Sequence, residues 1–162
     1  MPIKKSKRHS KYIGQFGEAI VCNMLSRSGF EVMLVDHVGI DVVAYRSDVG
    51  RIGISVKSRT RSVKKSEQTS INLFRSDDDG LETMCKFFDL EPWIAVYVEI
   101  ESGADLYLTS LENFRERYAG REGLTILAWK MKAKHRQEYS LDPNVMHLSI
   151  QFSQNNWFAQ FD

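Results

Sequence analysis

The chain has 162 residues, of which 43% are hydrophobic, and its 22 Lys and Arg nearly balance its 21 Asp and Glu, for a formal net charge of +1. This composition provides the core of one domain, and no run approaches the ~18 consecutive apolar residues of a membrane span. The first residues are basic and lack the apolar segment of a secretory signal, so we expect a cytoplasmic protein with no membrane partner. The four histidines have no ligand-like spacing, which argues against zinc, and Cys22 and Cys85 are typical of buried free thiols.

The first predicted element is a helix over residues 11–28, which ends at Gly29. Its apolar side chains repeat at helical spacing and form one arc, namely Ile13, Phe16, Ile20, Val21, Met24 and Leu25. Glu18 lies at the edge of this arc, where we expect a half-buried carboxylate. Glu18 is either a solvated residue whose negative charge stabilises the N-terminal half of the helix through the helix dipole, or an acid that points along the surface of a neighbouring sheet.

A short strand at 30–35 and a hairpin over 39–58 follow in the sequence. The turn of the hairpin lies at 47–50. Ser55 and Lys57 share one face of its second strand, because side chains alternate with period two.

The length of this turn decides whether Asp41, at the start of the first strand, lies on the same face as Lys57. A four-residue turn would place them on opposite faces, whereas a three- or five-residue connection, or a bulge at Gly50 or Gly53, would place them on the same face. The hairpin is therefore either structural, with Asp41 capping a turn and Lys57 solvated, or the scaffold of a site. A carboxylate beside an ammonium group can hold a divalent metal ion and polarise a phosphate.

The rest of the chain predicts elements that complete a sheet. Three aspartates at 77–79 lie at the start of a helix over 78–90, and N-capping with dipole compensation explains them better than a metal site. The later elements are strands at 93–100, 104–108 and 124–131, a helix over 111–119 capped by Ser110, and an edge strand at 147–152. The tail aromatics Trp157, Phe158 and Phe161 are expected to dock on the body or on a second subunit, which leaves a homodimer open, rather than to stack on bases.

This order of elements resembles the core of the PD-(D/E)XK nuclease superfamily over roughly residues 11–99. The matching positions are Glu18 in the first helix, Asp41 in the second strand and Ser55-Val56-Lys57 in the third. The closest members in style are small restriction-like and Holliday-junction-resolvase-like nucleases. The resemblance implies an α/β fold, a restriction-endonuclease-like mixed central sheet flanked by helices in the order αβββαβ, with extra C-terminal strands here. It also implies a single domain over 11–162 behind a basic arm, residues 1–10.

The resemblance further implies a metal-dependent DNA endonuclease that hydrolyses phosphodiester bonds. Glu18 and Asp41 would bind Mg²⁺ or Mn²⁺, and Lys57 would position the attacking water or stabilise charge on the scissile phosphate. Ser55 occupies the place of the usual Asp or Glu and would be an auxiliary hydrogen-bonding group, while Ile40 replaces the proline of the motif's name. A hydroxyl is a weaker ligand than a carboxylate for a hard cation. The alternative is therefore a weakened or inactive nuclease-fold protein that acts by binding DNA or a protein.

Two basic segments flank these positions and contain no acid. They contribute the expected DNA-binding residues, which are Lys4, Lys5, Lys7 and Arg8 in the arm and Arg59, Arg61, Lys64 and Lys65 after the hairpin. Such segments are either solvated loops or contacts to a phosphate backbone without sequence preference.

Overall fold

The computed structural model describes residues 5–61, 70–75, 80–154 and 157–158. The helices are α1 (His9–Arg27), α3 (Gly80–Phe88), α4 (Leu111–Arg117) and α5 (Ala133–Leu141). The strands are β1 (Glu31–His37), β2 (Ile40–Arg46), β3 (Gly50–Thr60), β4 (Ile71–Arg75), β5 (Glu91–Ile100), β6 (Gly103–Ser110), β7 (Ile126–Trp129) and β8 (Met146–Gln151).

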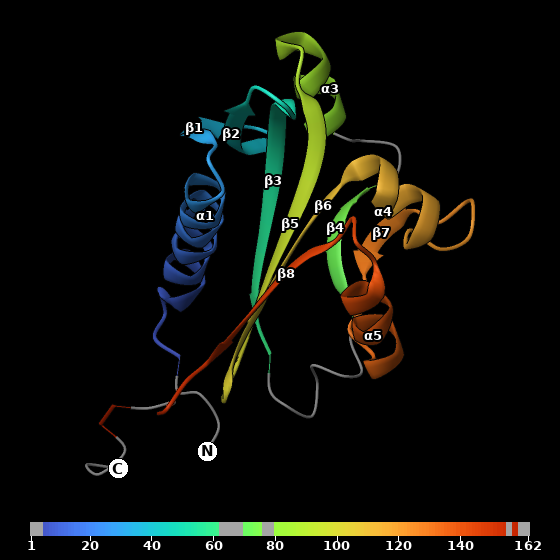
Figure 1. The fold of residues 1–162 in the computed structure, drawn as a ribbon. Helices are drawn as coiled ribbons and strands as arrows, with labels where there is room; N and C mark the ends of the chain where they lie inside the picture. The colour runs from blue at the N-terminus through green and yellow to red at the C-terminus, as the bar shows by residue number, and fades with distance from the viewer. Residues whose placement is uncertain (1–4, 62–69, 76–79, 155–156, 159–162) are drawn as a thin grey trace.

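The described strands form a mixed six-stranded sheet in the order β1-β2-β3-β5-β6-β8 and a separate β4-β7 pair (Figure 1). β3 and β5 run parallel, whereas the other neighbours in the large sheet are antiparallel. α3 lies between β3 and β5 in the chain and supplies the crossover that a parallel pair requires. The expected mixed sheet flanked by helices, with the 39–58 hairpin inside it, is therefore confirmed.

Each face of the large sheet has its own apolar core. α1 packs along one face through its buried residues Ile13, Gly17, Val21 and Leu25. The other face is covered by α3, α4, α5 and the β4-β7 pair, whose side chains form the second core around Trp129 (Figure 1). α1 therefore lies on one face of the hairpin and α3 on the other.

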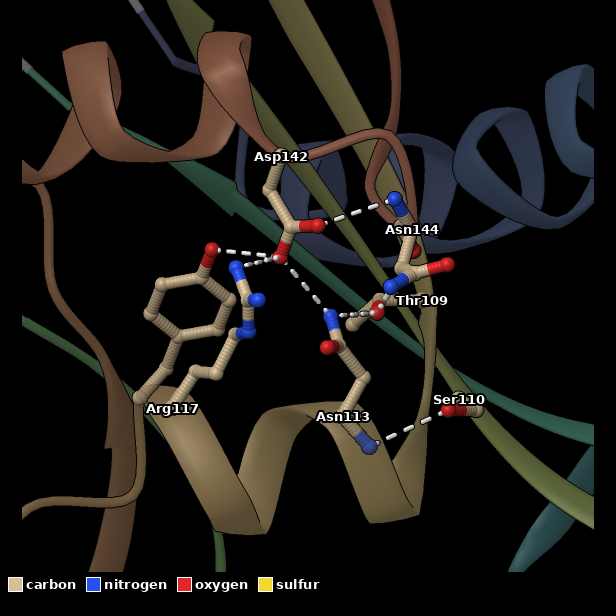
Figure 2. A network of polar contacts seen from close by, with 7 residues as sticks. Thr109, Ser110, Asn113, Arg117, Asp142 and Asn144 are labelled. Atoms are coloured by element: carbon tan, nitrogen blue, oxygen red, sulfur yellow. Dashed lines mark hydrogen bonds and ion pairs between the residues drawn. The ribbon is translucent and has the colours of Figure 1, made fainter.

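A buried polar network fixes α4 to the segment between α5 and β8 (Figure 2). Oδ2 of Asp142 accepts hydrogen bonds from Asn113 Nδ2 at 3.0 Å and from the Tyr118 hydroxyl at 2.6 Å, and Arg117 lies 3.5 Å away. The other carboxylate oxygen accepts from the Asn144 amide at 2.9 Å. Burial alone would raise the pKa of Asp142, but these hydrogen bonds and the Arg117 charge together lower it. The network is satisfied within the protein and has a structural role.

The structure corrects several expectations about individual elements. Phe16, expected in the buried arc of the first helix, is 47% exposed. The 124–131 strand pairs with β4 and does not join the large sheet. The sequence pattern also missed β4 and α5.

Other expectations agree with the structure or fall outside it. Ser110 caps α4 by accepting a hydrogen bond from the Asn113 amide at 3.1 Å, and β8 is an edge strand, both as expected. Trp157 is 79% exposed and Phe158 is 66% exposed, so neither ring is buried in the body as core cover would require. Phe161 and the aspartates at 77–79 lie outside the described residues.

Candidate active site

The β2–β3 connection has three residues, one of the lengths that bring Asp41 and Lys57 to the same face. Arg46 pairs with Gly50, and the register continues to Val42 opposite Ile54. Gly50, the first residue of β3 after this connection, has φ +98°, a conformation that glycine adopts without strain. Continued by one residue, this register places Asp41 opposite Ser55 and on the same face as Lys57.

Asp41 is anchored to β3 through its side chain. The ladder between β2 and β3 ends at Val42, and Oδ2 of Asp41 accepts a hydrogen bond from the Val56 amide at 2.6 Å. The carboxylate thus occupies the place of a strand carbonyl and is held between positions 55 and 57 of β3. Asp41 therefore does not cap a turn, and its orientation is set by the backbone of the strand that carries Lys57.

Glu18 reaches the same region from α1. It is half-buried, as expected, and burial raises its pKa; the negative charges of Asp41 and then Asp36 raise it further. The two carboxylates expected to share a cation are therefore close enough to repel each other. Asp36 was not predicted, because it lies where the β1–β2 register shifts between Leu34 and His37, an irregularity without a local sequence signal.

A close contact between α1 and β3 sets the position of Glu18. Gly17 is buried directly against Ser58, and a Cβ atom at position 17 would lie 2.0 Å from Ser58 Oγ and 3.4 Å from Tyr97 Cβ. A larger residue would require the Ser58 hydroxyl to move, so glycine at position 17 allows this close approach of α1, which carries the neighbouring Glu18, to β3.

The remaining two expected residues lie on β3. Ser55 is only 4% exposed, and Lys57 is half-buried. Among the described residues, none forms a hydrogen bond or ion pair with the Lys57 ammonium group. This amine is thus available to an external anion on the face that also carries Ser55.

The carboxylates fit a cation that relies on few protein ligands. Within the described parts of the chain, no cluster of three or more His, Cys, Asp or Glu side chains is arranged to hold a metal ion. Mg²⁺, however, is commonly bound by one or two carboxylates together with water and substrate phosphate. Glu18 and Asp41 supply two. Burial is the main cause that raises the pKa of Glu18, and the charges of Asp41 and Asp36 raise it further, a repulsion that a cation would reduce.

The basic arm lies against the end of β3. His9 Nε2 is 2.9 Å from Thr60 Oγ1, and Lys5 donates to the Thr60 carbonyl at 3.5 Å. The structure therefore places Lys5 near Arg59 and Arg61, and α1 begins inside the arm at His9. Of the other expected DNA-binding residues, Lys7 and Arg8 are exposed. Lys4, Lys64 and Lys65 lie outside the described residues.

The comparisons with known proteins give a fold but no family. No protein-family model matches the chain, and no curated protein matches its sequence. No helix in the described residues is long and apolar enough to cross a membrane. The structure is similar to that of Hjc, a Holliday junction resolvase from the archaeal hyperthermophile Archaeoglobus fulgidus, with a TM-score of 0.52 and 16% identity over 77% of this chain and 88% of that one. The likeness shows that this chain has the nuclease-type fold that the order of its elements predicted.

Proposed function

We propose that this protein is a DNA endonuclease that uses Mg²⁺ or Mn²⁺ to hydrolyse phosphodiester bonds. The observation that carries the proposal is the bond between Asp41 and the Val56 amide, which fixes a carboxylate beside Lys57 in a fold similar to that of a resolvase. Glu18 adds a second carboxylate from α1. The proposal takes residues 11–162 as one catalytic domain, with DNA as its partner in the cytoplasm.

Each residue of the proposed site has a distinct task. Asp41 and Glu18 hold the cation, and the Val56 amide keeps Asp41 oriented. The cation, when bound, would lower the pKa of a water molecule and neutralise charge on the phosphate. Lys57 binds a phosphate oxygen and stabilises the negative charge that develops as the bond breaks. Ser55 is the auxiliary hydrogen-bonding group of this site.

Substrate binding is assigned to basic residues around the end of β3. Lys5, Arg59 and Arg61 lie at this end, next to the strand that carries Lys57. Because they offer charge without a base-reading motif, they are expected to bind the phosphate backbone of any sequence. The sequence-adjacent Lys64 and Lys65, with Lys4, Lys7 and Arg8, complete this proposed set.

A second function, binding without cleavage, is favoured by one observation. Ser55 is neutral and nearly buried where related nucleases are expected to carry an acid, so the site has one charge fewer for a cation. A protein of this kind would keep the fold and the basic surface and would act by holding DNA or a partner protein.

Cleavage assays on plasmid, single-stranded and branched DNA during titration with Mg²⁺ or Mn²⁺ test the first function. Asp41→Ala should abolish cleavage, because it removes the anchored carboxylate. Lys57→Ala should lower the rate by about 10²–10³-fold while leaving cation affinity nearly unchanged. Cleavage that survives Asp41→Ala would show that the site is elsewhere.

Replacement of Ser55 separates the two functions. In a weakened nuclease, Ser55→Glu or Ser55→Asp should strengthen cation binding and raise the cleavage rate, because it restores an anionic oxygen. In a binding protein, the same change should leave cleavage absent and weaken DNA binding by placing negative charge beside phosphates. Sedimentation with and without DNA would show whether the active species is a homodimer.

A further inference from the structure

Three flat side chains form one row on the N-terminal half of α1. Arg8, the N-cap residue, is followed at four-residue intervals by Tyr12 and Phe16, so the three lie along one side of the helix. Tyr12 is 58% exposed and Phe16 is 47% exposed. Two neighbouring aromatic rings on α1 are therefore exposed to solvent.

The Phe16 ring is held in place although half of it is exposed. It contacts the buried ring of Tyr97 on β5 in an edge-to-face arrangement, with ring centroids 5.5 Å apart and an interplanar angle of 63°. An edge-to-face contact leaves a face of the Phe16 ring available to a third group. A ring fixed in this way loses little conformational entropy when it binds.

The segment that carries the row is positively charged, and Glu99 of β5 is the nearby acid, with an oxygen 3.9 Å from His9 Nε2. Lys5, Lys7 and Lys11 are exposed, and residues 5–17 contain no Asp or Glu. The first acid of α1 is Glu18, which lies about 200° around the helix from Phe16. The aromatic row is thus separated from the acids of the proposed active site and shares its surface with cations.

We propose that the row formed by Arg8, Tyr12 and Phe16 binds a single-stranded segment of DNA by stacking on its unpaired bases. Exposed aromatic rings within a basic surface have the two properties that such binding requires, namely faces for the bases and charge for the backbone. A duplex cannot use the rings in this way, because its base faces are already stacked on each other. The inference rests on the proposed function and adds to it a substrate class, namely DNA with an unpaired segment. This segment would cross α1 at the aromatic row, while the phosphates to be cleaved would lie on the other side of the helix.

Fluorescence anisotropy with a labelled single-stranded oligonucleotide and a blunt duplex of the same sequence tests this inference. Tyr12→Ala, and Phe16→Leu, which keeps an apolar contact with Tyr97, should each weaken single-strand binding by at least about fivefold, since one stacked base is worth about 1–3 kcal/mol. Duplex binding should change by less than twofold. Tyr12→Trp should retain single-strand binding, because it keeps a ring. Phe87→Ala is the matched control, since Phe87 is 72% exposed on α3 and should affect neither ligand.

Salt titration separates stacking from charge. The aromatic variants should keep the slope of log affinity against log salt, whereas Arg8→Gln should reduce its magnitude by about 0.7 for each phosphate of a single strand that the arginine neutralises. Equal losses of affinity for single strand and duplex, or an effect of Phe87→Ala equal to that of Tyr12→Ala, would overturn the inference. It would also fail if the parent bound no single strand at low salt, whereas a parent that binds single strands without cleaving any DNA would refute only the proposed nuclease.

Discussion

The close approach of Gly17 to Ser58 gives a sharp prediction, because α1 contains a second glycine as an internal control. An alanine stabilises a helix interior by about 0.5–1 kcal/mol relative to glycine, so Gly14→Ala, which meets open space, should raise the free energy of unfolding by that amount. At Gly17 the added Cβ atom would lie 2.0 Å from Ser58 Oγ and 3.3 Å from Ser58 Cβ. Overpacking of this kind costs about 1–3 kcal/mol, so Gly17→Ala should be less stable than Gly14→Ala by about that margin.

Urea unfolding followed by circular dichroism measures these differences, and a double-mutant cycle identifies their origin. Ser58 Oγ is buried without a hydrogen-bond partner among the described residues, so Ser58→Ala should be neutral or stabilising. Ser58→Ala should also recover about 1 kcal/mol or more of the stability that Gly17→Ala removes, because it deletes the nearest atom. Equal stabilisation by Gly14→Ala and Gly17→Ala, or a coupling energy of zero, would refute the close approach. Since Glu18 follows Gly17, Gly17→Ala should also weaken cation binding.

Two further predictions concern the polar network and the basic surface. Asp142→Asn should lower the free energy of unfolding by about 1–3 kcal/mol, because it removes the charged acceptor shared by Asn113 and Tyr118. The folded-state pKa of Asp142 is lowered, so its stabilisation is complete above the usual value of about 3.9 and is lost as pH falls through the lowered pKa. Denaturation from pH 6 to pH 2 should therefore show the parent and Asp142→Asn converging in stability; a constant gap would contradict this assignment. Replacing Arg59 and Arg61 with Gln should reduce the magnitude of the salt slope for duplex binding by about 0.9 for each phosphate that is no longer neutralised, and an unchanged slope would exclude both residues from the interface.

Local patterns were sufficient to predict the elements that carry the site. The apolar arc of α1 and the alternation along β2 and β3 are both properties of neighbouring residues, and both were found from the sequence. The same alternation placed Ser55 and Lys57 on one face. The sequence left open whether Asp41 lies on the same face as Lys57. That depends on the three-residue connection, which is set by the backbone conformation at Gly50 rather than by any periodic pattern.

Of the two elements that the sequence analysis missed, α5 carries little local signal. In α5 the only buried residue is Tyr139, so the apolar stripe that marks a helix against a core is absent. The negative charge of Asp36 raises the pKa of Glu18, and Asp36 lies at the register shift between β1 and β2. Phe16 followed the helical pattern of a buried residue, yet α1 covers only part of the sheet and leaves this ring at the edge. Such features depend on tertiary packing, which periodicity does not report.

The serine at position 55 is best understood through charge repulsion in the folded protein. Burial, Asp41 and Asp36 already raise the pKa of Glu18, and position 55 is nearly inaccessible to water, so a third carboxylate there would lose hydration beside like charges. Without a divalent cation, Ser55→Glu should therefore be destabilised relative to the isosteric neutral variant Ser55→Gln. Saturating Mg²⁺ should reduce or reverse that difference, because a ligand that binds only the folded state adds RT ln(1 + [L]/Kd) to stability. Thermal unfolding of both variants with and without Mg²⁺ measures this, and an Mg²⁺-induced shift that is equal in the two variants would show that position 55 does not face the cation site.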